Sequence, residues 1–281
     1  MKYAVLGAAG QLGRDLCPRL GGDVTPLTRA QADLTKPHTL RETLTALRPD
    51  VVVNCAAYNF VDRAESEPEA AMAANGWGVK ALAEVCRDLD CTLVHFSTDY
   101  VFGLDATRRT PFGPGEAPGP ISVYGLSKLA GEYVVRATVP RHFVIRTCGL
   151  YGVWGSGGKG GNFVETMLRV ASEGKPLRVV GDQECTPSYT VDIAEAAVQL
   201  IKTEQFGLHH LTNAGSCSWF ELARTALELK GIKADLQPIG SNQWKAAARR
   251  PAYSVLKCQA ELRPWQEAVA AYLNEREKIK R

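Results

Sequence analysis

The chain has 281 residues, of which 45% are hydrophobic, and a formal net charge of +3. This length fits one large domain or two small ones, and the nearly balanced charge argues against a nucleic-acid-binding protein. The eight cysteines form no C-x-x-C pair, which argues against a zinc site or a disulfide framework and favours reduced thiols in a cytosol. No apolar run approaches the roughly 18 residues of a membrane span. We therefore expect a cytoplasmic protein that binds neither nucleic acid nor a membrane.

A glycine-rich turn follows the first predicted strand. That strand is a short apolar run ending at Gly7, and Gly10 and Gly13 continue a G-x-x-G-x-x-G pattern that opens a helix. Glycines permit a tight turn and a close approach of the backbone to a pyrophosphate, and a helix N-terminus offers free N–H groups. The spacing differs from the standard G-x-G-x-x-G. We expect Gly7, Gly10, Gln11 and Leu12 to bind the phosphates of a dinucleotide.

The second predicted strand, residues 24–28, ends at Arg29. At this place an acidic residue favours NAD by binding the ribose 2′-hydroxyl, whereas an arginine meets the 2′-phosphate of NADP. Arg29 therefore favours NADPH, with NADH as the alternative, unless it is plain surface charge. Asp33 and Leu34 follow, and they either line the adenine side of the cofactor or cap the next helix.

Small residues follow the third predicted strand, residues 51–54. The apolar run of this strand is typical of one buried on both faces of a parallel sheet. Ala56 and Ala57 let the backbone lie close to a ligand, so we assign them, with the neighbouring Tyr58, to the cofactor site.

A polar stretch and a long helix are predicted next. Residues 61–68 are expected to form a turn and residues 69–89 one helix. Asn75 on that helix either faces solvent or points inward and forms hydrogen bonds near the active site.

The candidate catalytic residues come after this helix. Residues 92–96 form another predicted buried strand, so Thr98 lies at its carboxyl end, where open α/β sheets carry catalytic groups. The Thr98 hydroxyl either binds a substrate carbonyl or caps a turn. Tyr124 and Lys128 share one face of a predicted helix, although unrelated residues on a surface helix often have this spacing. We expect the lysine ammonium to lower the pKa of the tyrosine from about 10, so that the phenol exchanges a proton near neutral pH.

Strands and helices alternate through a further strand at residues 142–146. This alternation predicts an α/β fold with a doubly wound parallel sheet of the Rossmann type. Residues 1–150 are expected to form a dinucleotide-binding domain, to which residues 188–205 return, and residues 151–281 a smaller substrate-binding lobe. The elements expected in the C-terminal part are helices at 162–174, 190–201, 219–230 and 264–278 and a strand at 177–180.

Several blocks of sequence occur together in one protein family. They are, in chain order, Gly7-x-x-Gly10-x-x-Gly13 and residues 64–68, 97–102, 124–132, 161–163 and 250–256. In this combination they resemble the dTDP-4-dehydrorhamnose reductases, a family of extended short-chain dehydrogenases/reductases. The resemblance extends over nearly the whole chain.

The resemblance implies reduction of the C4 ketone of a nucleotide-linked 4-keto-6-deoxy sugar, dTDP-4-dehydrorhamnose to dTDP-rhamnose, with NADPH as hydride donor. Thr98, Tyr124 and Lys128 would form the catalytic triad, with Tyr124 protonating the developing alkoxide. Lys128 would also hold the nicotinamide ribose, and Asn75 and Tyr124 are further expected cofactor contacts. Arg250 would suit a diphosphate. The expected substrate contacts are Thr98, Asp99, Tyr100, Asn162, Gln183 and Arg250. The product would be a precursor for the synthesis of cell-surface polysaccharide. We predict that the enzyme needs no metal. We expect a homodimer.

Alternative functions remain open. Sugar-nucleotide dehydratases need an Asp-Glu pair after the threonine, but here Asp99 is followed by Tyr100, which favours a reductase; epimerases with recycled NAD are less firmly excluded. A non-catalytic NADP-binding regulatory subunit, like the methionine adenosyltransferase beta subunit, has the same fold, but it would not need the complete triad. Family members often carry a tryptophan where this chain has Gly149, and Trp154, in the glycine-rich run 153–160, is a candidate replacement.

Overall fold

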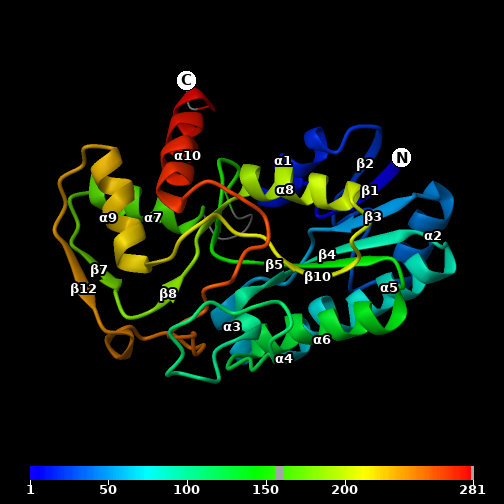
Figure 1. The fold of residues 1–281 in the computed structure, drawn as a ribbon, viewed down its shortest axis with the longest axis horizontal. Helices are drawn as coiled ribbons and strands as arrows, with labels where there is room; N and C mark the ends of the chain where they lie inside the picture. The colour runs from blue at the N-terminus through cyan, green and yellow to red at the C-terminus, as the bar shows by residue number, and fades with distance from the viewer. Residues whose placement is uncertain (156–160, 280–281) are drawn as a thin grey trace.

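The structure of the chain, a computed structural model, describes residues 1–155 and 161–279. The larger part of the molecule has three layers, with one parallel sheet between two layers of helices. A smaller lobe of helices and short strands lies beside it (Figure 1). The predicted Rossmann-like architecture is therefore confirmed. The glycine-rich run expected at 153–160 lies partly outside the described residues.

Within the described residues the main sheet has six parallel strands in the order β10-β5-β4-β3-β1-β2. These are β1 (Lys2–Leu6), β2 (Asp23–Leu27), β3 (Val51–Asn54), β4 (Thr92–Thr98), β5 (His142–Thr147) and β10 (Gly207–His210). Every residue of β3 is buried, because helices cover both faces of the sheet. Since β10 pairs with β5, the segment that returns to the sheet extends beyond the expected residues 188–205.

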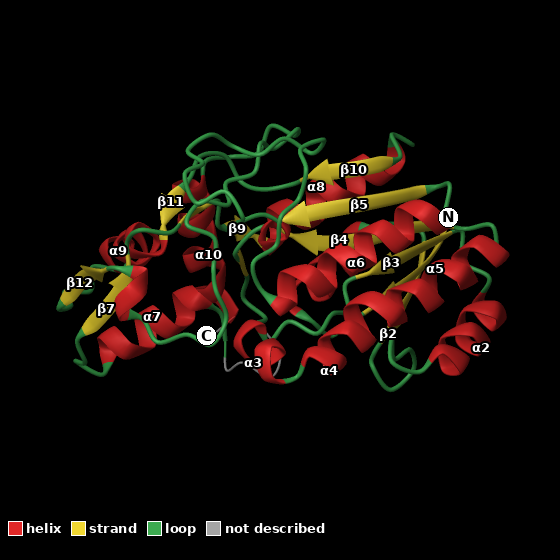
Figure 2. Ribbon diagram, turned by 90° about the horizontal axis from the view of Figure 1, so that it is seen from below, coloured by secondary structure: helices red, strands yellow, loops and turns green. Residues whose placement is uncertain are grey.

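Helices cover the two faces of the sheet in separate layers. They are α1 (Gln11–Leu16), η1 (Cys17–Arg19) and α8 (Thr190–Lys202) on one face, and α2 (Pro37–Leu47), α5 (Gly78–Asp88) and α6 (Val123–Thr138) on the other. Figure 2 shows α2, α5 and α6 in front of the sheet. Ile193, Ala197 and Ile201 of α8 share one buried apolar cluster with Leu12 and Leu16 of α1. The late helix α8 thus closes an apolar face that α1 covers only in part.

The strand order reverses between β1 and β3. β2 pairs with one side of β1, and β3, β4 and β5 follow on the other side. In a doubly wound sheet, ligands bind in the crevice outside the carboxyl ends of the strands at such a switch point. Gly7 follows β1 at this end, Ala56 lies just after β3, and Thr98 is the last residue of β4.

A separate apolar core holds the smaller lobe together. Its helices are α7 (Phe163–Ser172), α9 (Trp219–Leu229) and α10 (Trp265–Ile279). The strands of the lobe pair as β6 (Leu150–Tyr151) with β9 (Ser188–Tyr189), β7 (Leu177–Val180) with β12 (Leu236–Ile239), and β8 (Glu184–Cys185) with β11 (Cys217–Ser218). Tyr151, Tyr189 and Tyr272 pack against one another, with ring centroids 5.3–5.9 Å apart.

For the segment after β3, the predicted turn is wrong, whereas the predicted long helix is present with a π-helical turn inside it. Residues 61–68 contain helix α3 (Val61–Ser66) in place of a turn, because Asp62 suits the first turn of a helix and Pro68 begins the next one. The single helix expected over 69–89 is built from α4 (Pro68–Met72), the π-helical turn η2 (Ala73–Trp77) and α5. π-turns occur frequently at functional sites, and Asn75 lies in this one.

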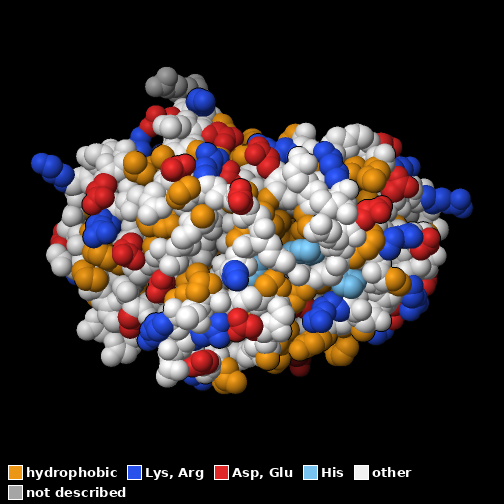
Figure 3. All heavy atoms as spheres, in the orientation of Figure 1, with side chains coloured by type: hydrophobic (Ala, Val, Ile, Leu, Met, Phe, Trp, Pro, Cys, Tyr) orange, Lys and Arg blue, Asp and Glu red, His pale blue; other side chains and the backbone are white. Residues whose placement is uncertain are grey.

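Charges of both signs are mixed over the face drawn in Figure 3, where Lys and Arg side chains are interspersed with Asp and Glu. This distribution agrees with the small net charge of the chain. In the described part of the chain, no helix has both the length and the apolar character that a membrane span requires.

Candidate active site

The glycine turn after β1 has the shape of a phosphate cradle. Gly7 has a φ of +71°, and a Cβ there would lie 2.7 Å from the backbone nitrogen of Ala56. A Cβ on Gly13 would lie 2.5 Å from the carbonyl oxygen of Gly7. Gly10 precedes α1, and no side chain caps the helix there. The turn therefore leaves bare backbone at the crevice, which fits a dinucleotide pyrophosphate.

Gln11 and Leu12 complete the predicted cradle in different ways. The Gln11 side-chain nitrogen donates to the carbonyl of Leu150 at 3.1 Å, whereas its Oε1 is buried without a partner among the described residues. A buried acceptor of this kind is costly unless a ligand supplies a donor. Leu12 is buried in the apolar core, so only its backbone is suited to contact a cofactor.

Asn75 points inward, which settles the alternative left open by the sequence. It is only 1% exposed. Its Oδ1 accepts a hydrogen bond from the Tyr58 nitrogen, and its Nδ2 donates to the Tyr58 carbonyl, both at 2.9 Å. Nδ2 also donates to Ser127 Oγ at 3.0 Å. Asn75 thus joins the loop after β3 to α6, the helix that carries Tyr124, and its own polar atoms are already used.

The small residues after β3 form the other wall of the crevice. The Ala56 nitrogen donates to Asn54 Oδ1 at 3.1 Å, and Ala57 is exposed. The Tyr58 hydroxyl donates to Glu67 at 2.7 Å. The cofactor role of Ala56, Ala57 and Tyr58 stays a prediction that this open backbone supports.

Arg29 lies in solvent at the end of β2. Its side chain is 83% exposed, and Nε pairs with Asp33 Oδ2 at 3.0 Å. The other Asp33 oxygen accepts hydrogen bonds from the nitrogen and hydroxyl of Thr35 at 2.9 and 2.8 Å. Leu34 is buried. Asp33 therefore orients Arg29 through an ion pair, and the contacts predicted for these residues with NADPH stay predictions.

Thr98, Tyr124 and Lys128 come together at the carboxyl end of β4. The Thr98 hydroxyl donates to Asp99 Oδ1 at 3.1 Å and shares a hydrogen bond with Tyr124. Lys128 is 3% exposed, and its ammonium donates to the carbonyl of Phe96 at 2.7 Å. The structure therefore places the three predicted catalytic side chains at the same end of the sheet, with Thr98 and Lys128 buried and Tyr124 half-buried.

Two glycines allow α6 to come this close. A Cβ on Gly125 would collide with the Tyr100 carbonyl oxygen, and one on Gly131 would collide with the Asn75 carbonyl oxygen. The rings of Tyr100 and Tyr124 meet edge to face, with centroids 6.0 Å apart. Tyr124 is therefore held from two sides, by the start of α6 and by the segment after β4.

The prediction that Lys128 lowers the pKa of Tyr124 is wrong for this structure. Burial raises the pKa of Tyr124 to about 12, and the hydrogen bond with Thr98 lowers it only in part. Burial also lowers the pKa of Lys128 to about 8, although Glu132 opposes this shift. At neutral pH the phenol is thus protonated, which is the form that can donate a proton.

Asp99 is a buried carboxyl directly after Thr98 in the chain. It is 2% exposed, and burial raises its pKa to about 6. Its oxygens accept hydrogen bonds from Thr98 and, at 2.6 Å, from Ser254, and the Cys148 thiol is a further partner. With its oxygens engaged in this way, Asp99 acts chiefly by orienting Thr98, and its predicted contact with substrate is untested. Ser254 was not predicted as a site residue, although it lies in the 250–256 block.

Arg250 lies beside Tyr100 and is already paired with an acidic residue. Its guanidinium forms two hydrogen bonds with the Asp62 carboxylate, at 3.0 and 2.7 Å, and a further one with Tyr100. The pairing lowers the pKa of Asp62. This arrangement fixes a positive group beside Tyr100, and the predicted contact of Arg250 with a diphosphate remains a prediction.

The other two predicted substrate residues differ in their surroundings. Asn162 caps α7: its Oδ1 accepts from the Glu165 nitrogen, and its Nδ2 donates to the Gly152 carbonyl and the Tyr272 hydroxyl, at 3.0–3.3 Å. These bonds give it a structural role, and a substrate contact is only a prediction. Gln183 is half-buried in the loop before β8.

Trp154 does not lie where the sequence interpretation would put a sugar-binding aromatic ring. Its indole nitrogen donates to Asp15 at 2.9 Å, and the Arg14 guanidinium lies 5.1 Å from its ring centre. These partners belong to α1, so Trp154 packs beside the cofactor-side helix.

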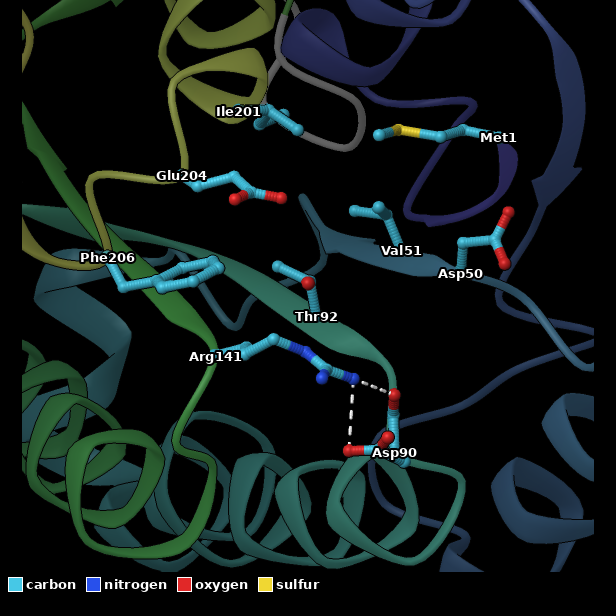
Figure 4. A pocket seen from close by; sticks show the side chains of 9 residues that line it. All are labelled: Met1, Asp50, Val51, Asp90, Thr92, Arg141, Ile201, Glu204 and Phe206. Carbon is cyan, nitrogen blue, oxygen red and sulfur yellow. Dashed lines mark hydrogen bonds and ion pairs between the residues drawn. The ribbon is translucent and has the colours of Figure 1, made fainter.

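A hollow of about 260 Å³ lies at the opposite end of the main sheet. Figure 4 shows Asp50, Asp90, Thr92 and Arg141 among its lining side chains, with Arg141 paired to Asp90. These residues flank the amino ends of β3, β4 and β5. The hollow therefore lies at the end of the sheet opposite to Thr98 and Tyr124. We do not assign it as the active site.

Comparisons with known proteins agree with this geometry. The family model described as RmlD substrate binding domain matches residues 1–278. The chain belongs to this family. A dTDP-4-dehydrorhamnose reductase of Mycolicibacterium smegmatis is 39% identical over 95% of this chain and 84% of its own length. A dTDP-4-keto-6-deoxy-D-glucose reductase of Streptomyces niveus is 38% identical over 95% of this chain and 91% of its own length.

A solved structure of the family has nearly the same fold. The crystal structure of dTDP-4-dehydrorhamnose reductase from Bacillus anthracis, in complex with NADP, has a TM-score of 0.92 and 34% identity, and covers 98% of this chain and 100% of that one. The predicted family resemblance is confirmed. Among the described residues, no group of three or more His, Cys, Asp or Glu is placed to hold a metal ion; the absence of a metal requirement stays a prediction.

Proposed function

We propose that the chain reduces the C4 ketone of dTDP-4-dehydrorhamnose to the hydroxyl of dTDP-rhamnose with NADPH. The observation that carries this function is the hydrogen bond between Thr98 and Tyr124, with the buried Lys128 ammonium one helical turn from Tyr124, at the same carboxyl end of the strands as the bare glycine turn. The names of the family members and the NADP complex of a relative support the same activity. Tyr100 after Asp99 gives no base for water elimination, which favours reduction over dehydration.

Each residue of the proposed site has a role that follows from its charge and its position. When bound, NADPH supplies the hydride. Tyr124, protonated because its pKa is about 12, donates its proton to the C4 oxygen as negative charge develops there. Thr98 shares a hydrogen bond with Tyr124 and so holds the phenol in place, and Lys128, charged below its pKa of about 8, supplies positive potential one helical turn away. The glycine turn holds the pyrophosphate, and Arg29 is assigned to the 2′-phosphate.

The assay follows NADPH oxidation with dTDP-4-dehydro-6-deoxy-L-mannose. We expect one NADPH consumed per sugar, and a loss of at least about 10²-fold in turnover with Tyr124→Phe at unchanged NADPH affinity. Tyr133→Phe is the matched control, since Tyr133 lies on the same helix but is 52% exposed. Sugar conversion without net NADPH consumption would favour an epimerase or dehydratase, and no turnover of any 4-keto sugar would favour a regulatory subunit.

A second 4-keto sugar belongs in the same assay. The Streptomyces niveus relative is named for dTDP-4-keto-6-deoxy-D-glucose, which differs from the rhamnose precursor in ring stereochemistry. A kcat/KM higher with this substrate than with the rhamnose precursor would change the sugar assigned as substrate. The assignment of Tyr124 as proton donor would not change.

The cellular setting is part of the proposal. Eight free cysteines and a need for NADPH favour the cytoplasm. A homodimer is proposed from Leu126 and Tyr133 on α6 and Trp77 on η2, which are 54%, 52% and 64% exposed. Light scattering should give about twice the chain mass of 30.5 kDa; a monomer at assay concentration would refute this assembly.

A further inference from the structure

Gly149 leaves a space at the carboxyl end of β5 that another residue fills. Its φ is +51°, and a Cβ there would lie 3.2 Å from the Pro187 Cα and 3.4 Å from Cη2 of Trp219. A side chain at position 149 would therefore be strained and would meet both neighbours. The edge of the Trp219 indole thus occupies the place toward which a side chain at position 149 would point.

The indole of Trp219 is held in this position by its surroundings. Trp219 is the first residue of α9, whose start is fixed by a capping box between Ser218 and Glu221. Its ring packs against Phe163, with centroids 4.9 Å apart and planes inclined by 56°. The residue is only half-buried, so part of this fixed ring remains open to solvent.

A short chain of contacts connects Trp219 to the reacting groups. Thr98 is paired in register with Thr147 on β5, and Asp99 shares hydrogen bonds with Thr98 and with Cys148. Gly149 is the next residue after Cys148 and the one that touches Trp219. Trp219 therefore touches the residue that follows Cys148, and Cys148 is a partner of Asp99 next to Thr98.

We propose that Trp219 forms the aromatic wall of the sugar pocket and binds the apolar face of the deoxy-sugar ring. An indole presents a rigid apolar surface with one polar N–H group, which suits a ring bearing C–H groups, a methyl group and hydroxyls. No hydrogen bond of this N–H is found among residues 1–155 and 161–279, so it is free to donate to a sugar hydroxyl. This inference rests on the proposed sugar-nucleotide substrate.

Because Trp219 would contact the sugar away from C4, it should act on binding more than on the chemical step. Trp219→Ala is expected to raise KM for the sugar nucleotide by about three- to tenfold. The same variant should change kcat by less than about threefold and leave NADPH affinity unaltered, since uniform binding sets KM. Trp219→Phe should restore most of the lost affinity.

A binding experiment without cofactor separates this proposal from the proposed activity. Titration of the protein with dTDP-rhamnose should quench its tryptophan fluorescence, and Trp219→Phe should abolish most of that change. Trp77→Phe is the matched control, because Trp77 is 64% exposed on η2 and lies outside the residues argued to bind substrate; it should keep the quench. Quench retained in Trp219→Phe, or an unchanged sugar KM in a folded Trp219→Ala, would overturn the role of Trp219. An inactive parent protein that still shows Trp219-dependent quench would reject the reductase activity alone.

Discussion

The two ends of the main sheet differ in how their polar groups are held. At the carboxyl end, Glu132 and Arg146 form an ion pair with side chains 0% and 1% exposed, close to the buried Lys128 and Asp99. At the amino end, Arg141 and Asp90 form a pair with side chains 45% and 89% exposed beside the hollow of Figure 4. The charged pair beside the hollow is thus partly solvated, whereas the charged pair at the carboxyl end is fully buried. Buried charged groups at the carboxyl ends of the strands are typical of functional sites in open α/β sheets.

Removing the buried partner at the carboxyl end should have the largest effect. Glu132 accepts two hydrogen bonds from Arg146, at 2.9 and 2.7 Å, and one from Ser97 at 2.5 Å. Glu132→Ala should lower the free energy of unfolding by about 3–5 kcal/mol, because it leaves a buried guanidinium unpaired. Urea denaturation measures this change. Arg141→Ala, the matched change at the amino end, should cost about 1 kcal/mol or less; equal losses would remove the contrast between the two ends.

The pKa of Lys128 predicts how cofactor affinity depends on pH. Its ammonium loses its proton as pH rises through about 8, and a neutral amine attracts the anionic cofactor less. NADPH affinity should be constant below this pH and then fall by up to about tenfold per pH unit. Fluorescence titration between pH 6.5 and 9.5 would measure the profile. Lys128→Met should bind more weakly with no such step, and a step that survives this change would have to belong to another group.

Replacing Arg29, at the rim of the predicted cofactor crevice, should have a smaller effect, on the preference for NADPH over NADH. Arg29→Asp should shift the ratio of NADPH to NADH affinity by about tenfold toward NADH, since a charged hydrogen bond to the 2′-phosphate is lost. Dissociation constants for both cofactors give the ratio. His38 provides a control, because its imidazole is 85% exposed beside Glu42, and His38→Asp should leave the ratio unchanged. An unaltered ratio in Arg29→Asp would reject its 2′-phosphate role.

A change in the hollow should have the smallest effect. Arg141→Glu reverses a charge there, but the lining residues do not touch the catalytic cluster. We expect kcat/KM for the sugar and the NADPH dissociation constant to stay within about twofold of the parent values, because exposed charges this far apart are screened by salt. A loss of tenfold or more at 0.15 M salt would show that the two ends of the sheet are coupled.

Local sequence patterns predicted the parts of the molecule that local forces decide. The apolar run of β3 and the glycines after β1 can be recognised in the sequence. A buried strand requires consecutive apolar residues, and a tight turn requires glycines. Thr98 followed from the rule that catalytic groups lie at the carboxyl ends of parallel strands, whereas Tyr124 followed from its spacing to Lys128 and from the family resemblance. These features depend little on contacts between distant segments.

Tertiary contacts decided what the sequence could not predict. The pKa of Tyr124 depends on burial beneath Tyr100 and beside Asp99, so the tyrosine–lysine spacing alone gave the wrong direction. Asp62 pairs with Arg250, which lies 188 positions further along the chain, and no local pattern marks such a pair. β10 has only four residues, so its sequence does not predict that it pairs with β5 in the main sheet.

The return of the chain to its first domain has a consequence for attempts to divide the protein. A fragment ending at residue 150 would lack α8 and β10, so Leu12 and Leu16 would lose their apolar neighbours and β5 would become an uncovered edge strand. Bare edges of this kind recruit other chains. Truncation before residue 210 should therefore give an aggregating product, and the intact chain should melt in one cooperative transition.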